Sequence, residues 1–126
     1  MAFRITFAYP PGSNRLWRNL RGRMVVSEAA SAWKKTAAWQ ARAQGCLLLE
    51  GQAIVDLILH PKLTKAGRAS ATRLDVDAPI KLTLDALQGV AYTDDKQVVA
   101  VSCRVGDPQP GGGLTLRVWG VGEEAP

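Results

Sequence analysis

Acidic side chains and a lysine lie close together in one part of this 126-residue chain. Asp75 and Asp77 are two residues apart, Lys81 follows four residues later, and Asp94-Asp95 form a second acidic pair. Mg²⁺ prefers oxygen ligands and is usually held by one or two carboxylates together with water and substrate phosphate. The pattern therefore predicts a Mg²⁺ site, with Mn²⁺ as the alternative ion, whose ligands are Asp75, Asp77, Asp95 and Asp94.

Hydrolysis of a phosphodiester is the chemistry that suits such a site. The reaction needs a deprotonated water and compensation for the negative charge that grows on the phosphate and the leaving oxygen, and a bound metal supplies both. Lys81 carries a compact positive charge that can contact the phosphate or stabilise the leaving oxygen. The predicted catalytic residues are therefore Asp75, Asp77, Asp95 and Lys81.

These residues also have a purely structural interpretation. Asp77 can cap a helix, Asp94-Asp95 can belong to a turn, and Lys81 can pair with Asp85 one helical turn away. Spacing alone does not separate the two interpretations, so the context of the rest of the chain decides between them.

That context is basic. The formal net charge is +5 and the sequence pI is about 9.6, which favours polyanionic partners. Half of the 16 Lys and Arg residues fall within the first 42 positions, against a single acidic residue, Glu28. We expect a surface that docks a polyanion, made by two basic segments, with the candidates Arg15, Arg18, Arg21, Arg23, Lys62, Lys65, Arg68 and Arg73.

Composition and length indicate one globular domain over residues 1–126. Cys46 and Cys103 form no CxxC pair and are expected to be half-buried free thiols, and His60 is expected merely to end a strand. No apolar run is long enough to span a membrane and Met1–Arg4 has no secretory layout, which predicts a cytoplasmic protein.

Periodicity predicts the elements that must position the acidic residues. Residues 4–9 alternate as a half-buried strand, 15–23 form a basic loop, and 27–44 form a helix capped by Ser27, with Trp33 and Trp39 as buried residues. Residues 52–59 are apolar enough for a central strand, and a basic loop follows to residue 72.

A second helix is predicted from Pro79 to Leu87, with Ile80, Leu84 and Leu87 as its buried stripe. If residues 74–77 are extended, Asp75 and Asp77 project to one side, and Lys81 lies one helical turn beyond Asp77. Residues 97–105 and 114–119 are expected to form an antiparallel hairpin. The order β-α-β-α-β-β predicts the α+β class with one mixed sheet and two main helices.

These residues carry a resemblance to a known family. The matches are Tyr9-Pro10-Pro11-Gly12-Ser13-Asn14-Arg15, Arg21-Gly22-Arg23, Ser27, Arg73-x-Asp75-x-Asp77-x-x-x-Lys81, Asp85-Ala86-Leu87 and Asp94-Asp95-x-Gln97-Val98. Together, in this order, they resemble the RusA family of Holliday junction resolvases over nearly the whole chain. One position departs from the family pattern, because Ala78 stands where the family usually has asparagine.

The resemblance implies a homodimeric, Mg²⁺-dependent endodeoxyribonuclease that acts in DNA recombination and repair by nicking two strands of a four-way DNA junction symmetrically. It matches Asp75, Asp77 and Asp95 to the family's catalytic carboxylates and Lys81 to its lysine near the scissile phosphate. Two alternatives remain open from the sequence: a non-catalytic basic DNA-binding module, and a nuclease for other branched or single-stranded DNA.

Overall fold

The computed structural model describes residues 2–11, 17–67 and 76–126, and only the backbone at 17–20 and 23–26. In chain order its elements are β1 (Ala2–Phe7), β2 (Trp17–Leu20), β3 (Arg23–Val26), α1 (Glu28–Ala43), β4 (Ala53–His60), α2 (Asp77–Leu87), the short 3₁₀ helix η2 (Asp95–Gln97), β5 (Val98–Val105) and β6 (Gly113–Gly120). The predicted α+β class, with one mixed sheet and two helices, is confirmed, and β2 and β3 are an addition to the predicted order.

Strand β4 lies inside a four-stranded sheet with the order β1-β6-β4-β5. It pairs antiparallel with β6 and parallel with β5, so the sheet is mixed as predicted. The predicted hairpin between the last two strands is wrong, because β4 separates β5 from β6. The loop between them folds against the end of β4, where Gly106 N–H donates to the Leu59 carbonyl at 3.0 Å.

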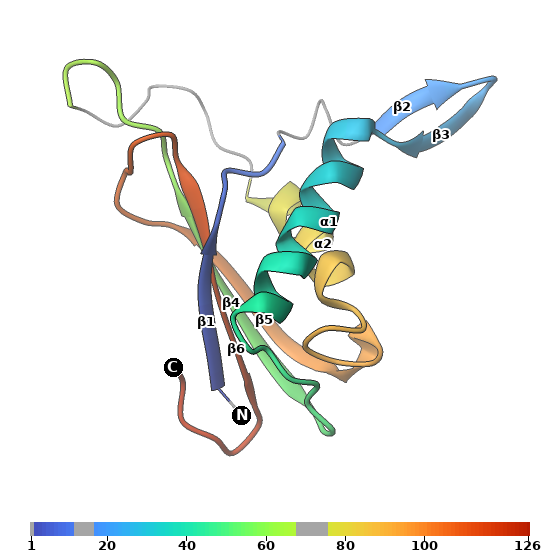
Figure 1. The fold of residues 1–126 in the computed structure, drawn as a ribbon, viewed down its shortest axis with the longest axis vertical. Coiled ribbons are helices and arrows are strands. Elements are labelled where there is room, and N and C mark those ends of the chain that lie inside the picture. Colours follow the sequence, from blue (N-terminus) through green and yellow to red (C-terminus); the bar gives the residue numbers. More distant parts are fainter. Residues whose placement is uncertain (1, 12–16, 68–75) are drawn as a thin grey trace.

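The segment predicted as a basic loop contains a separate hairpin, formed by β2 and β3. Its turn is Arg21-Gly22, with φ of 52° and 80°, as in the primed two-residue turns that suit hairpins. The usual sequence signal for such a turn is Asn-Gly or Asp-Gly, so the Arg-Gly pair did not predict a hairpin here. Figure 1 shows the hairpin projecting from the end of the molecule where α1 begins.

Helices α1 and α2 cover the same face of the four-stranded sheet (Figure 1). The Ser27 hydroxyl accepts a hydrogen bond from Ala30 N–H at 3.1 Å, which confirms the predicted N-cap of α1. The buried residues of α1 recur at helical spacing along one face: Ala30, Trp33, Ala37 and Ala41. Trp39, which was predicted to be buried, falls outside this face and is 68% exposed.

Helix α2 begins earlier than predicted, at Asp77, and Val76 before it already has helical dihedral angles (φ −83°, ψ −13°). The condition that residues 74–77 are extended therefore fails at Val76 and Asp77, and residues 74 and 75 lie outside the described residues. Pro79 fits the first turn of the helix because its missing N–H has no partner to lose there. Of the predicted stripe, Leu87 is buried as expected, but Ile80 and Leu84 are only half-buried. The other buried residues of α2 are Pro79, Leu82, Thr83 and Ala86.

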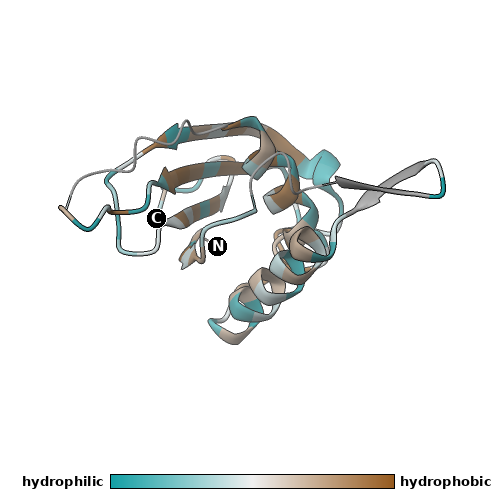
Figure 2. Ribbon diagram, turned by 90° about the horizontal axis from the view of Figure 1, so that it is seen from above, coloured by the Kyte–Doolittle hydropathy of each residue, from teal (hydrophilic) through white to brown (hydrophobic). Residues whose placement is uncertain are grey.

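The core fills the space between the two helices and the sheet. Val55, Leu57 and Leu59 alternate along β4 toward the helices and are at most 1% exposed. The Trp33 indole N–H donates to the Ala8 carbonyl at 2.9 Å, which ties α1 to the end of β1. Figure 2 shows the hydrophobic residues concentrated on the strands of this sheet. Cys46 is buried and Cys103 half-buried, and both are free thiols as predicted.

The other face of the sheet carries polar side chains. Asp56 accepts hydrogen bonds from Ser102 Oγ at 2.6 Å and Arg117 Nε at 2.8 Å, so both of its carboxylate oxygens are used. His60 ends β4 as expected, and its ring nitrogens lie 2.8 Å from the Asp107 carbonyl oxygen and 2.7 Å from Thr115 Oγ1. These bonds satisfy polar groups that the strands would otherwise bury without partners.

The Asp56 carboxylate is a source of acid sensitivity. Burial alone raises the pKa of Asp56, but hydrogen bonds from Ser102 and Arg117 and the charges of Arg117 and Arg104 outweigh burial and lower that pKa below its usual 3.8. A carboxyl group with a lowered folded-state pKa stabilises the protein above its unfolded pKa, and this stabilisation is lost as the pH falls through the folded value.

We predict that Asp56→Asn lowers the free energy of unfolding at pH 7 by roughly 2–3 kcal/mol, because Arg117 loses its carboxylate partner. Below pH 4, the unfolding free energy of the variant should also fall less steeply with pH than that of the wild type. Urea denaturation from pH 7 to pH 3 measures both effects, with Asp107→Asn, at an exposed position, as the control. Equal pH dependence in wild type and Asp56→Asn would contradict the prediction.

Candidate active site

The charged residues of α2 form one exposed stripe. Asp77, Lys81 and Asp85 are spaced four residues apart, so they lie on neighbouring turns of the helix. Lys81 Nζ is 3.9 Å from Asp85 Oδ2, and the Lys81 side chain is 71% exposed. The ion pair that the structural interpretation predicted is thus present, and the predicted spacing of Lys81 one turn beyond Asp77 is confirmed. Such a surface pair contributes only about 0.5 kcal/mol, so Lys81 can change partners at little cost.

The Asp94-Asp95 loop is held by a capping box. Asp94 Oδ1 accepts from Lys96 N–H at 2.9 Å, while Gln97 Oε1 accepts from Thr93 N–H at 2.8 Å and Asp94 N–H at 3.1 Å. The Gln97 side-chain amide then donates to the carbonyls of Leu49 at 2.8 Å and Gly51 at 2.9 Å. One side chain therefore anchors the acidic loop to the chain that leads into β4.

Gln97 is a positioning residue that the sequence reasoning missed. An acidic or hydroxyl residue followed three positions later by Glu or Gln is the sequence signature of a capping box, and Asp94-x-x-Gln97 has this form. The signature is typical of the start of a longer helix. Here the capped element, η2, is only three residues long.

Tyr92 connects the loop to α2. Its hydroxyl donates to the Leu84 carbonyl at 2.7 Å, and its ring is fully buried. Burial raises the pKa of Tyr92, and the negative charges of Asp95 and Asp85 raise it further. Asp95 therefore lies near the end of α2 that carries Asp85.

Asp77 lies near a different part of β5. Burial raises the pKa of the Cys103 thiol, and the charges of Asp56 and Asp77 raise it further, so Asp77 is within electrostatic reach of Cys103 near the end of this strand. Asp95 instead precedes the start of β5. The two carboxylates are thus found toward opposite ends of α2, a helix of 11 residues and about 16 Å.

The predicted metal ligands are not gathered in the part of the chain that the structure describes. Among residues 2–11, 17–67 and 76–126, no three Asp, Glu, His or Cys side chains form a group that could hold a metal ion. Asp75 falls outside these ranges. Asp77 is exposed and Asp95 half-exposed. Carboxylates in this setting fit the chemistry of Mg²⁺, which keeps several waters and needs only one or two protein carboxylates.

The predicted DNA-docking residues fall into two groups. Arg15, Arg68 and Arg73 lie outside the described residues, as do the side chains of Arg18 and Arg23. Arg21 is exposed in the turn between β2 and β3, and Lys62 and Lys65 are exposed after β4. Figure 1 shows these two basic segments at the same end of the molecule and on opposite sides of it. They lie far apart and flank the start of α1.

The family model described as Endodeoxyribonuclease RusA matches residues 8–118 of this chain. The chain belongs to the RusA endodeoxyribonuclease family. The match includes the α2 stripe, the capped acidic loop and both basic segments, and it makes endodeoxyribonuclease the activity implied for this chain. No curated protein matches the chain. In the described part of this RusA-family protein, no helix has the length and apolar character needed to cross a membrane.

We predict that Gln97→Ala loosens the acidic loop, because the amides of Thr93 and Asp94 lose their acceptor and two carbonyls lose their donor. Amide hydrogen exchange at Thr93 and Asp94 should accelerate by roughly tenfold or more, with about 1–3 kcal/mol lost in unfolding free energy.

The matched variant for this measurement is Gln97→Glu, which keeps an acceptor for the two amides but cannot donate to Leu49 and Gly51. It should protect Thr93 and Asp94 better than Gln97→Ala does. Unchanged exchange in Gln97→Ala would show that the capping box does not hold the loop.

Proposed function

We propose that this protein is a Mg²⁺-dependent endonuclease that resolves four-way DNA junctions by paired, symmetric nicks. The observation that supports this most is the combination of family membership with solvent-accessible carboxylates and a weakly engaged lysine on α2 and the loop that follows. The two basic segments at one end of the molecule provide phosphate contacts on either side of this helix.

Asp75, Asp77 and Asp95 are the residues proposed to hold the metal, with Asp94 as a further ligand. Asp94 is exposed, and its Oδ1 accepts from Lys96 N–H at 2.9 Å, so the capping box fixes the position of this carboxylate. When bound, Mg²⁺ would supply an activated water and neutralise charge on the phosphate. The carboxylates repel one another without a cation, so binding of the ion is favoured where they converge.

Lys81 is proposed to contact the scissile phosphate or the leaving oxygen. Its side chain is 71% exposed, and the ammonium group forms a 3.9 Å ion pair with Asp85, so it can turn toward a phosphate placed over α2. There it stabilises the negative charge that develops during cleavage. Asp85 then acts as the resting partner of Lys81.

A homodimer is the proposed assembly, because two related nicks require two active centres. The separation of Asp77 from Asp95 along α2 adds a second argument for it. We propose that each active centre combines Asp75, Asp77 and Lys81 of one protomer with Asp95 of the other. A two-fold axis then produces two identical centres facing one junction.

The function is tested with a synthetic four-way junction in Mg²⁺, compared with EDTA and with a linear duplex of the same sequence. Symmetric nicks in the junction that appear only with Mg²⁺ support the proposal. Tight binding without cleavage would instead identify a non-catalytic DNA-binding module, for which Ala78 in place of the family asparagine is the relevant departure. Equal cleavage of other branched or single-stranded DNA would identify a broader nuclease.

We predict that Asp77→Asn and Asp95→Asn each abolish cleavage but leave junction affinity near that of the wild type, since each removes a ligand charge and no phosphate contact. Mixing the two variants should restore single nicks, because a mixed dimer contains one centre with both carboxylates intact.

Subunit exchange of the mixture is followed with differently tagged copies. Single nicks that appear only after exchange support a shared centre, whereas an inactive mixture places each centre within one protomer. Asp75→Asn belongs to the same set and should also be inactive. Full cleavage by any two of these carboxylate variants would overturn the proposed ligand set.

We predict that Lys81→Ala lowers the single-turnover cleavage rate by roughly 100-fold while changing junction affinity much less, because one phosphate contact is a small part of a wide basic surface. Asp85→Asn is the control, since it also removes the ion pair but keeps the lysine. Equal fractional losses of rate and affinity in Lys81→Ala would make Lys81 a docking residue.

A further inference from the structure

A pocket of about 430 Å³ lies apart from the α2 stripe, where the end of β1, the first half of α1 and the chain after β4 meet. Its lining residues are Ala8, Tyr9, Pro10, Pro11, Ala29, Ala32, Trp33, Thr36 and Lys62. A volume of this size is within the range of small-ligand sites. The pocket is open to solvent on one side, and none of the residues proposed for catalysis lines it.

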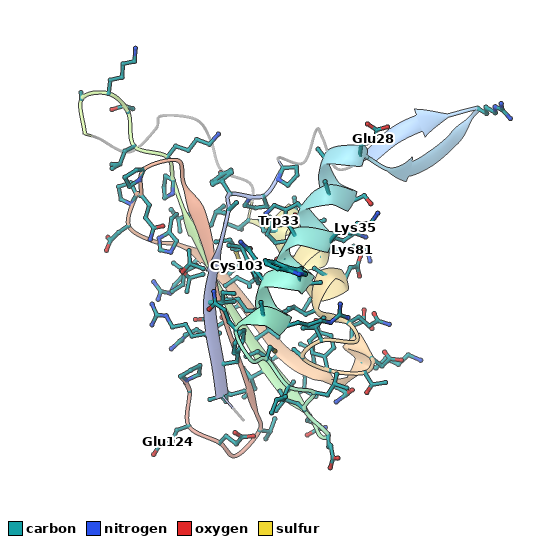
Figure 3. All side chains as sticks on the ribbon, viewed as in Figure 1. Glu28, Trp33, Lys35, Lys81, Cys103 and Glu124 are labelled. Carbon is teal, nitrogen blue, oxygen red and sulfur yellow. The ribbon has the colours of Figure 1, made fainter. Side chains whose placement is uncertain are left out.

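Small residues on α1 create the hollow. Ala29, Ala32 and Thr36 lie on the helix face that adjoins the pocket, beside Trp33. Trp33 is held by its hydrogen bond to the Ala8 carbonyl and stands edge-on to Phe7, with ring centres 5.7 Å apart. Figure 3 shows Trp33 between α1 and β1, so it forms a fixed back wall.

An aromatic ring and a positive charge stand together at the pocket. Lys62 Nζ lies 5.3 Å from the centre of the Tyr9 ring, within the range of a cation–π contact. Both side chains pack on Gly112, where an added Cβ would come within 2.6 Å of the Tyr9 ring and 3.0 Å of Lys62 Cγ. The Tyr9 phenol is neutral at pH 7 and can donate a hydrogen bond, and burial raises its pKa further above the usual 10.0.

We propose that this pocket binds a single unstacked nucleotide of the DNA substrate. The base packs against Tyr9 and the apolar wall of Pro10, Pro11 and Ala32, and its phosphate takes the ammonium group of Lys62. Base–aromatic stacking tolerates any base, and a cation beside the ring supplies the partner for the backbone. This role of the pocket rests on the proposed action on branched DNA. It specifies that the substrate carries an accessible, unstacked nucleotide.

The position of the pocket agrees with this occupant. It lies at the end of the molecule where Figure 1 shows the β2–β3 hairpin on one side and the chain after β4 on the other. DNA held by both basic segments would pass over the opening between them. A nucleotide that is already unpaired enters such a pocket at the smallest unstacking cost.

The test compares two short single strands with equal charge, tetrathymidylate and a tetramer of abasic nucleotides. Titration by fluorescence anisotropy should show that the wild-type protein binds tetrathymidylate roughly tenfold more tightly, because only this strand offers bases for stacking. Equal affinity for the two strands would overturn the proposal, since phosphate contacts would then account for all the binding.

Variants locate the preference for bases. Ala32→Leu fills the pocket from an exposed helix position and should abolish the preference, whereas Ala43→Leu, at the far end of α1, should keep it. Tyr9→Ala should also abolish the preference and Tyr9→Phe should keep it. Lys62→Gln should weaken binding of both strands more than Lys65→Gln does. A preference that survives in Ala32→Leu and Tyr9→Ala would place the bases elsewhere and overturn the proposal.

Junction cleavage in Mg²⁺ is measured on the same wild-type preparation. If the protein prefers strands with bases but does not cleave junctions, the nucleotide pocket is supported and the proposed function is contradicted. If the protein cleaves junctions but shows no preference for bases, the proposed function is supported and the role of the pocket is contradicted.

Discussion

The parallel pairing of β4 with β5 is the constraint on which the arrangement of the candidate active site depends. Two adjacent parallel strands cannot be joined by a tight turn. The chain must therefore return to the end of the sheet where β4 begins before β5 can start. Helix α2 makes this return, and it packs against the same face of the sheet as α1. As a result, Asp77 is found where the return begins and Asp95 where it ends, with Lys81 between them on α2.

The polar side chains near this crossover divide into two kinds. Tyr92 and Gln97 have their hydrogen-bonding groups engaged with backbone atoms, which fixes the end of the crossover against α2 and against the residues before β4. Asp77 and Lys81 are exposed on α2, where Lys81 is paired with Asp85 at 3.9 Å. A rigid scaffold that presents accessible charges is the arrangement that a metal- and phosphate-binding site requires, because its ligands need a defined position without being buried.

The two faces of the sheet stabilise the fold by different interactions. The face under the helices is packed with apolar residues such as Leu57 and Leu116, which are fully buried. The opposite face holds Asp56, Arg117 and His60 in hydrogen bonds between neighbouring strands. Because these polar groups are satisfied within the sheet, no helix is needed on that face.

Much of this protein follows from the sequence alone, because local patterns report local structure. The alternation along residues 4–9, the Ser27 cap and the ends of the two helices each depend on nearby residues, and all are confirmed within one or two positions. The ordered motifs likewise predicted the RusA family, since spacing along the chain is what they record.

Only the tertiary structure decided which strands are neighbours and where the charged residues lie relative to one another. The hairpin expected between the last two strands is replaced by the order β1-β6-β4-β5, because the apolar β4 is best buried between two partners. That placement sets Asp77 and Asp95 toward opposite ends of α2, and it brings Tyr9, Trp33 and Lys62 around one pocket. Contacts between residues distant in the chain depend on how the hydrophobic faces pack, and short sequence patterns do not contain that information.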